Sequence, residues 1–380
     1  MKRTFFLIGF AIIFVAVMSA DLWTALKDGE ITPVLDAGRK ANAQAASSWK
    51  SRLVGQVELT GKEDLIGSLG VLAVTEDEWF VISDPKDTNI KLFDAAGKFV
   101  KSWGRKGQGP GEFETIGVMS YKKPFLIVPD SSRRAVQIFE RKAPSDFQRI
   151  YHITNIPVSD PRRRFDIYKD NLLVDEVIKD KQGIAYHLYL KGMTSSDPIL
   201  IMPWAIRYGM DTKDDFMAKH SAFAELGLGM SFFDVVGDDA YYAWEGEMRI
   251  IKINLKSKTW AFFGKETKNY IRPDLSDRQS HRPAEGRYSR IFGVYADESK
   301  VLLGFANPNP DWKRLKVFFQ VYDLNGVFLG EIPFSDSAEF ADILRYVYHR
   351  QSGSIFVPIT IVDEKGIDVH FVVKKYRITQ

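Results

Sequence analysis

The 380-residue sequence contains no cysteine. This absence excludes disulfide bonds, thiolate metal sites, cysteine nucleophiles and lipid attachment to a cysteine. An excess of one charge is also lacking, because 52 lysines and arginines nearly balance 49 aspartates and glutamates. Binding nucleic acid in bulk requires a strong basic field, so the charge balance argues against a nucleic-acid partner.

Motifs for catalysis and metal binding are scarce as well. The six histidines are never within five residues of each other, so they form no local zinc motif. Four glycines between residues 104 and 111 are followed by no Gly-Lys-Ser/Thr, and turns that need positive φ explain them better than a phosphate loop does. We therefore expect no cofactor. A divalent metal bound by side chains from distant parts of the chain stays open.

The N-terminus has the pattern of a targeting signal. Lys2 and Arg3 precede an uncharged apolar run over residues 5–20, as in a secretory leader. Cleavage after Ala20 would put Met18 where a small residue is preferred, whereas the apolar run is shorter than the roughly 20 residues of a spanning helix. A cleaved signal peptide and a retained membrane anchor both stay open. With either, we expect the protein to be exported to the periplasm or the cell surface.

Residues 21–50 have the composition of a linker. Gly29 and Pro33 interrupt the first part, and residues 36–48 are rich in alanine and polar residues but poor in large apolar ones. Such a segment cannot form a core of its own. We interpret it as a spacer between the membrane and a domain that covers residues 51–380.

A hairpin and a glycine-rich exit stand out at residues 84–113, DPKDTNIKLFDAAGKFVKSWGRKGQGPGEF. Residues 90–94 and 98–103 are short β-rich runs joined by a tight turn at 95–97, which is typical of an antiparallel hairpin. The Asp-led loop, the hairpin and the G-x-G-x-G-x-F exit resemble the NHL-type repeat of six-bladed β-propellers, a group that includes TolB-like exported proteins. The resemblance implies an all-β propeller fold.

Six copies of a short strand motif indicate six blades. After IKLFD at 90–94, similar runs end at residues 140, 190, 254, 323 and 377. The positions that we take as equivalent are Phe93, Phe139, Tyr189, Ile253, Tyr322 and Tyr376. They are 46 to 69 residues apart, close to the period of a propeller blade except where polar insertions lengthen it.

The last blade needs an additional strand. Each of the first five motifs is followed by a strand-like partner, but none follows the sixth. An unpaired edge strand is a liability that closed propellers avoid. Residues 52–59, RLVGQVEL, have no other assigned role, so we predict that they complete the last blade as its outer strand.

One face of this propeller is predicted to carry the function. The links from the outer strand of one blade to the inner strand of the next lie on it, including the insertions at 205–230 and 265–287, and loops on a rigid scaffold often bind ligands. Arg163 and Arg164 precede the inner strand of blade three, and Arg290 precedes that of blade five. Guanidinium groups there could attract a carboxylate or phosphate, although ion pairs with nearby acids are an alternative. His220 and His281, one in each insertion, could meet across the same face.

Two aspartates occupy equivalent loops of the first two blades. Asp84 in ISDPKDTNI and Asp130 in VPDSSRRAV each follow a second strand. Carboxylates in such loops accept hydrogen bonds from neighbouring amides, so we expect a structural role for both.

Two classes of function remain open. The favoured one is a monomeric, membrane-tethered propeller that binds a peptide, a glycan or a small anionic ligand without catalysis. The alternative is a lyase or hydrolase whose polar groups converge from several blades, with or without a metal. Propellers perform both kinds of role, so the fold does not decide between them.

Overall fold

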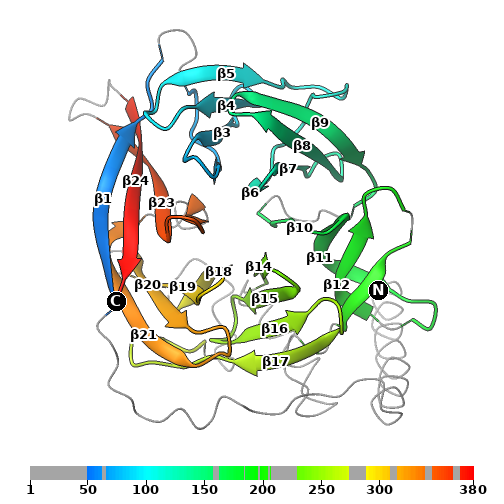
Figure 1. The fold of residues 1–380 in the computed structure, drawn as a ribbon, viewed down its shortest axis with the longest axis vertical. Helices are drawn as coiled ribbons and strands as arrows, with labels where there is room; N and C mark the ends of the chain where they lie inside the picture. The colour runs from blue at the N-terminus through cyan, green and yellow to red at the C-terminus, as the bar shows by residue number, and fades with distance from the viewer. Residues whose placement is uncertain are drawn as a thin grey trace, which may run out of the picture.

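Six antiparallel sheets surround one axis, which Figure 1 shows nearly end-on. The structure is a computed structural model, and it describes residues 49–61, 66–156, 162–183, 185–195, 197–203, 206, 229–273, 288–308, 315–338, 345–362 and 369–380. In these residues 24 strands form six four-stranded sheets. The protein is therefore an all-β, six-bladed propeller, as the repeats predict.

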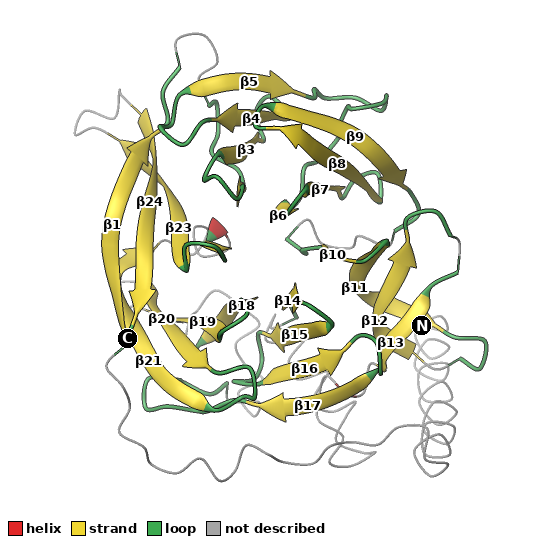
Figure 2. Cartoon of the chain, viewed as in Figure 1, coloured by secondary structure: helices red, strands yellow, loops and turns green. Residues whose placement is uncertain are grey.

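The first five blades follow the chain from the axis outward (Figures 1 and 2). Blade one contains β2 (Leu72–Val74), β3 (Phe80–Asp84), β4 (Asn89–Phe93) and β5 (Phe99–Trp103), and blade two contains β6 (Ser120–Lys122), β7 (Phe125–Asp130), β8 (Ala135–Ala143) and β9 (Asp146–Ile153). Blade three contains β10 (Asp166–Tyr168), β11 (Asn171–Lys179), β12 (Ala185–Gly192) and β13 (Ile199–Pro203). Blade four contains β14 (Ser231–Val236), β15 (Asp239–Trp244), β16 (Ile250–Asn254) and β17 (Thr259–Phe263), and blade five contains β18 (Arg290–Ala296), β19 (Val301–Pro308), β20 (Leu315–Tyr322) and β21 (Phe328–Ala338).

Blade six joins the two ends of the propeller. It contains β22 (Val347–His349), β23 (Ser354–Val362) and β24 (Val369–Thr379), and its outer strand is β1 (Lys50–Glu58). The pairing of β1 with β24 is antiparallel and runs from Lys50 opposite Thr379 to Glu58 opposite Val372. The predicted closure by the N-terminal strand is thus confirmed. The strand begins two residues earlier than predicted, at Lys50.

The third strand of each blade has the burial that the repeated motif requires. The six equivalent positions are all buried, with 0 to 3% of each residue exposed: Phe93, Phe139, Tyr189, Ile253, Tyr322 and Tyr376. The outer strand β5 instead alternates between partly buried and exposed residues. Leu92 and Phe93 of β4, for example, pack into the apolar clusters on opposite faces of blade one, so the motif position itself must be apolar.

The apolar core is divided among the six boundaries between blades. Each of six buried clusters combines residues from two neighbouring blades. Between blades one and two, for example, Leu92 and Phe113 pack with Leu126 and Phe139. Gly104 lies against this cluster at a φ of 85°, and a Cβ on it would come within 2.6 Å of the Phe113 ring. The glycine-rich exit therefore serves turn geometry and close packing here.

The predicted leader (1–20), almost all of the linker and most of both insertions lie outside the described residues. Within the part that the structure describes, no helix combines the length and the apolar character needed to cross a membrane.

Deleting residues 50–58 should lower the melting temperature by on the order of 10 °C or more. The deletion leaves the edge of β24 unpaired and removes Val57, which packs against the cluster between blades six and one. Circular dichroism during heating measures the change. A chain that begins at Trp49 is the control and should melt like the longer protein, whereas equal melting of the deleted chain would contradict a role for closure in stability.

Candidate functional site

The connections between the second and third strands are tied to the links that enter the inner strands. Asp84 accepts hydrogen bonds from the amides of Gly67 (2.6 Å) and Ser68 (3.1 Å). Asp130 accepts from the amides of Glu114 (3.0 Å) and Thr115 (3.1 Å) in the same way. These contacts place both kinds of loop on one face of the propeller, which we call the link face.

Both aspartates are fully buried, and their hydrogen bonds hold backbone in place. Asp84 also pairs with the buried Lys91, whose Nζ lies 2.9 Å from Oδ2. Burial alone would raise the pKa of Asp84, but the hydrogen bonds from Lys91 and Gly67 lower it below its ordinary value. The carboxylate thus stays ionised and anchored, which is the geometry of a structural group.

Two of the predicted arginines contact acidic side chains. The Arg163 Nε atom lies 3.2 Å from Glu176 Oε1, and Nη1 lies 3.6 Å from Asp175 Oδ2. Arg290 Nη2 lies 2.5 Å from Oε1 of Glu245. Both guanidinium groups therefore take part in ion pairs on the link face, as the alternative interpretation of these arginines expects.

Arg164 is placed differently from the other two. It precedes the inner strand of blade three, yet its Nη2 donates to the carbonyl of Tyr346 in blade six at 3.1 Å. Its guanidinium carbon lies 5.4 Å from the centre of the Tyr295 ring in blade five. Blade six lies opposite blade three in the ring (Figure 1). The contacts of Arg164 with blades five and six therefore bring its positive charge toward the axis. The remaining predicted ligands, His220 and His281, lie outside the described residues.

A buried polar cluster between blades three and four was not predicted as a site. The Nδ1 atom of His187 and the hydroxyl of Ser231 both contact the carboxylate of Asp175. These three residues are 2 to 4% exposed. The serine hydroxyl donates to the carboxylate, so it is not activated by the imidazole as a catalytic nucleophile would be.

A positional signal in the sequence could have identified His187. It occupies the place two residues before the third-strand position Tyr189, and the equivalent places in three other blades hold Lys91, Gln137 and Gln320, all fully buried. Each is polar and has a nearby partner, such as the Glu112 carbonyl that accepts from Gln137 at 2.9 Å. A buried polar residue inside an apolar strand motif thus predicts a hydrogen-bonded group.

Charged side chains also connect the inner strands around the axis. Lys122 of blade two lies 3.1 Å from Asp166 of blade three, whose carboxylate accepts from the amide of Val235 in blade four (3.0 Å). Asp234 of blade four accepts from the amide of Ala296 in blade five (2.7 Å) and pairs with Arg350 of blade six. This network joins five blades.

The network affects how Asp234 titrates. Burial raises the pKa of this carboxyl above its ordinary value, the charge of Arg350 opposes the rise, and the negative charge of Asp166 adds to it. Its oxygens are nevertheless used by Ala296 and Arg350, so the network holds inner strands together.

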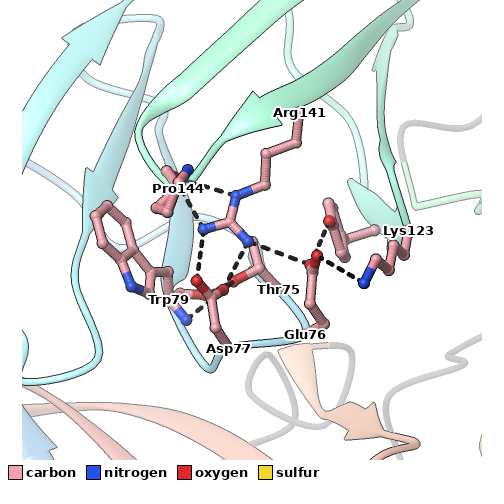
Figure 3. Close-up of polar contacts among 8 residues, drawn as sticks. Thr75, Glu76, Asp77, Trp79, Lys123, Arg141 and Pro144 are labelled. Carbon is pink, nitrogen blue, oxygen red and sulfur yellow. Dashed lines mark hydrogen bonds and ion pairs between the residues drawn. The ribbon is translucent and has the colours of Figure 1, made fainter.

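The opposite face carries an ion-pair cluster between blades one and two (Figure 3). Arg141 of blade two points at the loop that joins β2 to β3 and binds Asp77 through two hydrogen bonds of 2.6 and 3.0 Å. Glu76 lies between Arg141 (3.2 Å) and Lys123 (3.5 Å). The Arg141 side chain is only 4% exposed and also donates to the carbonyl of Pro144. These contacts clamp one blade to the next.

A tyrosine of the next inner strand supports two such loops. Tyr121 of blade two donates to Glu76 of blade one, and Tyr348 of blade six donates to Asp297 of blade five. The two tyrosines are the middle residues of β6 and β22. Repetition of this contact at two blade boundaries indicates a structural role. Among the described residues, no group of three or more potential ligands could bind a metal ion.

Comparison with known proteins agrees with the fold. A family described as a 6-bladed beta-propeller, DUF5128, matches residues 54–123, from the closing strand to the first strand of blade two. A DUF4221 family member from Bacteroides vulgatus has a similar structure, with 11% identity, a TM-score of 0.59, and coverage of 87% of this chain and 99% of its own. A Bacteroides fragilis protein inferred to be exported has 14% identity, a TM-score of 0.54, and coverage of 90% and 98%. No curated protein matches the sequence. The chain is thus similar in fold to these two Bacteroides proteins.

Replacing Arg141 with alanine should lower the free energy of unfolding by about 2 to 3 kcal/mol, because Asp77 and Glu76 lose a buried charged partner. The free energy of unfolding of Arg141→Lys should lie between those of the wild type and Arg141→Ala, since lysine retains the charge but not the paired donors. Chemical denaturation measures both. Arg105→Ala is the control, because Arg105 also pairs with a glutamate but its side chain is 81% exposed. A similar loss in both alanine variants would contradict the clamp.

Ionisation of Asp297 should make the free energy of unfolding depend on pH in the acidic range. Burial opposes ionisation, but hydrogen bonds from Lys300, Ser299 and Tyr348 lower the pKa of this carboxyl from 3.8 to about 2. A pKa lowered by folding stabilises the protein above the ordinary value, and that stabilisation is lost as pH falls from about 4 to 2. The wild type should lose about 2 kcal/mol more than Asp297→Asn over this range. Equal losses in denaturation curves at the two pH values would disprove the assignment.

Proposed function

We propose that this protein is an exported propeller that acts by binding, and that it takes a ligand with an anionic group over the axis on its link face. The ligand class that we favour is an acidic peptide or a glycan with uronic acids. Within the six-bladed propellers, the NHL-type features of residues 84–113 support a place among the exported, TolB-like proteins. The leader-like residues 1–20 support export and a position near a membrane, in keeping with the inferred export of the Bacteroides fragilis protein.

The position of Arg164 carries this proposal. Its guanidinium is held at the axis by a ring of blade five and a carbonyl of blade six. An arginine that is fixed in advance loses less side-chain entropy when it binds a ligand. A ligand at this point lies near the inner ends of several blades and can contact the links of each.

The surrounding acidic groups favour binding over catalysis. Three carboxylates each accept hydrogen bonds from two backbone amides of a neighbouring link, at 2.6 to 3.1 Å: those of Asp84, Asp130 and Glu245. A carboxylate used in this way is poorly suited to accept a proton from a substrate. The loops that would surround a ligand are therefore rigidly attached, as a binding surface requires.

A thermal-shift screen with acidic peptides and oligosaccharides of uronic acids should find a ligand that stabilises the wild type. Arg164→Ala should weaken its binding at least about tenfold, because a charge-assisted hydrogen bond is lost. Arg164→Lys should retain part of the affinity. Arg52→Ala, an exposed arginine on β1, is the control and should bind like the wild type.

Two results would refute the proposal. One is a ligand whose affinity is the same with and without Arg164. The other is a stoichiometric metal in the purified protein together with turnover of the bound ligand, which would support the alternative lyase or hydrolase.

A further inference from the structure

Three basic side chains gather at the outer part of blade two, away from the axis. Arg133 lies in the turn between β7 and β8, and Arg149 and His152 lie on the outer strand β9. Arg149 and His152 are exposed, and Arg133 is partly buried. Gln137 of β8 pairs with His152 in the sheet, so the turn and the outer strand meet around this glutamine.

Neutral oxygens hold the two guanidinium groups. Arg133 Nη1 lies 3.4 Å from the carbonyl oxygen of Glu112, which also accepts from Gln137 Nε2 at 2.9 Å. The other end of the same amide, Gln137 Oε1, lies 3.4 Å from Arg149 Nη1. The fully buried Gln137 thus contacts Arg149 directly and shares the Glu112 carbonyl with Arg133.

The charges of this group are not compensated by direct ion pairs. In the described ranges, neither Arg133 nor Arg149 has a carboxylate within ion-pair distance, and each guanidinium group makes only the long contact given above. The two nearby acids have other partners. The Glu112 carboxylate pairs with Arg105 and accepts a hydrogen bond from the amide of Gly109. The Asp130 carboxylate accepts hydrogen bonds from two amides of the preceding link.

The charges of both arginines affect the pKa of His152. Partial burial lowers its pKa below the ordinary value, the charges of Arg133 and Arg149 lower it further, and that of Asp130 opposes them. Both guanidinium groups are therefore close enough to act on the ring. A bound anion would relieve this repulsion and favour the protonated histidine.

We propose that Arg133, Arg149 and His152 form a binding site for a phosphate dianion, either free or as a monoester. The donors come from a turn and from two positions of a strand around Gln137, and a tetrahedral anion has several oxygens that can accept from them. A single planar carboxylate is matched by one guanidinium fork and leaves the other donors unused. Two guanidinium groups and a titratable imidazole also match the charge of a phosphate group, about −1.5 to −2 at neutral pH. The site is separate from the ligand position proposed at Arg164.

Titration calorimetry with inorganic phosphate on the full chain tests the site. Arg133→Ala and Arg149→Ala should each weaken phosphate binding at least about tenfold. Arg52→Ala and Arg164→Ala are the controls and should keep the wild-type affinity, and the second control separates this site from the proposed function. In NMR titrations, phosphate should raise the pKa of His152.

Glycerol 1-phosphate in parallel distinguishes the two sources of the anion. Tighter binding than inorganic phosphate assigns the site to a monoester, and weaker binding assigns it to free phosphate. Acetate at the same ionic strength should bind neither the wild type nor the variants measurably. Equal binding of acetate and phosphate, or wild-type affinity for phosphate in the Arg133→Ala, Arg149→Ala double variant, would overturn the proposal.

Discussion

The pairing of β1 with β24 is the contact on which the ring depends. Every apolar cluster is shared by two neighbouring blades, so no blade has a complete core by itself. Closure continues beyond the strand pair, because the amide of Thr60 donates to the carbonyl of Gly97 in blade one at 2.8 Å. A Cβ on Gly97 would lie 2.2 Å from the Glu58 carbonyl, so glycine is required where the closing segment crosses the hairpin. The N-terminal strand thus completes blade six and contacts blade one.

Much of this architecture could be predicted from the sequence, because the third strand is covered on both faces in every blade. That constraint kept the motif position apolar even where Ile253 replaces the usual aromatic residue and where insertions stretch the period to 69 residues. The start of the closing strand was harder to predict from the sequence. A bulge between Leu53 and Gly55 shifts its register, and the pairing extends to Lys50. Local propensity does not specify such a shift.

The polar groups were harder to predict, because their partners lie far away in the sequence. Arg290 could be placed at the start of an inner strand, but its carboxylate partner Glu245 is 45 residues earlier and belongs to another blade. Arg164 reaches residues 131 and 182 positions away, which no local motif specifies. The same residue type thus serves as an ion-pair partner at one link and as a charge at the axis in another. Only the three-dimensional structure distinguishes Arg164, which reaches across the ring, from the other arginines of the links.

Closure also has a topological consequence. Lys50 and Thr379 are direct partners in one sheet, so the two ends of the propeller are neighbours. A short connecting peptide could join them, and the chain could then be opened in a loop between two other blades, giving a circular permutant with the same six interfaces. Which blade is assembled from both chain ends is therefore decided by connectivity, because the packing between blades does not distinguish a first blade from a last one.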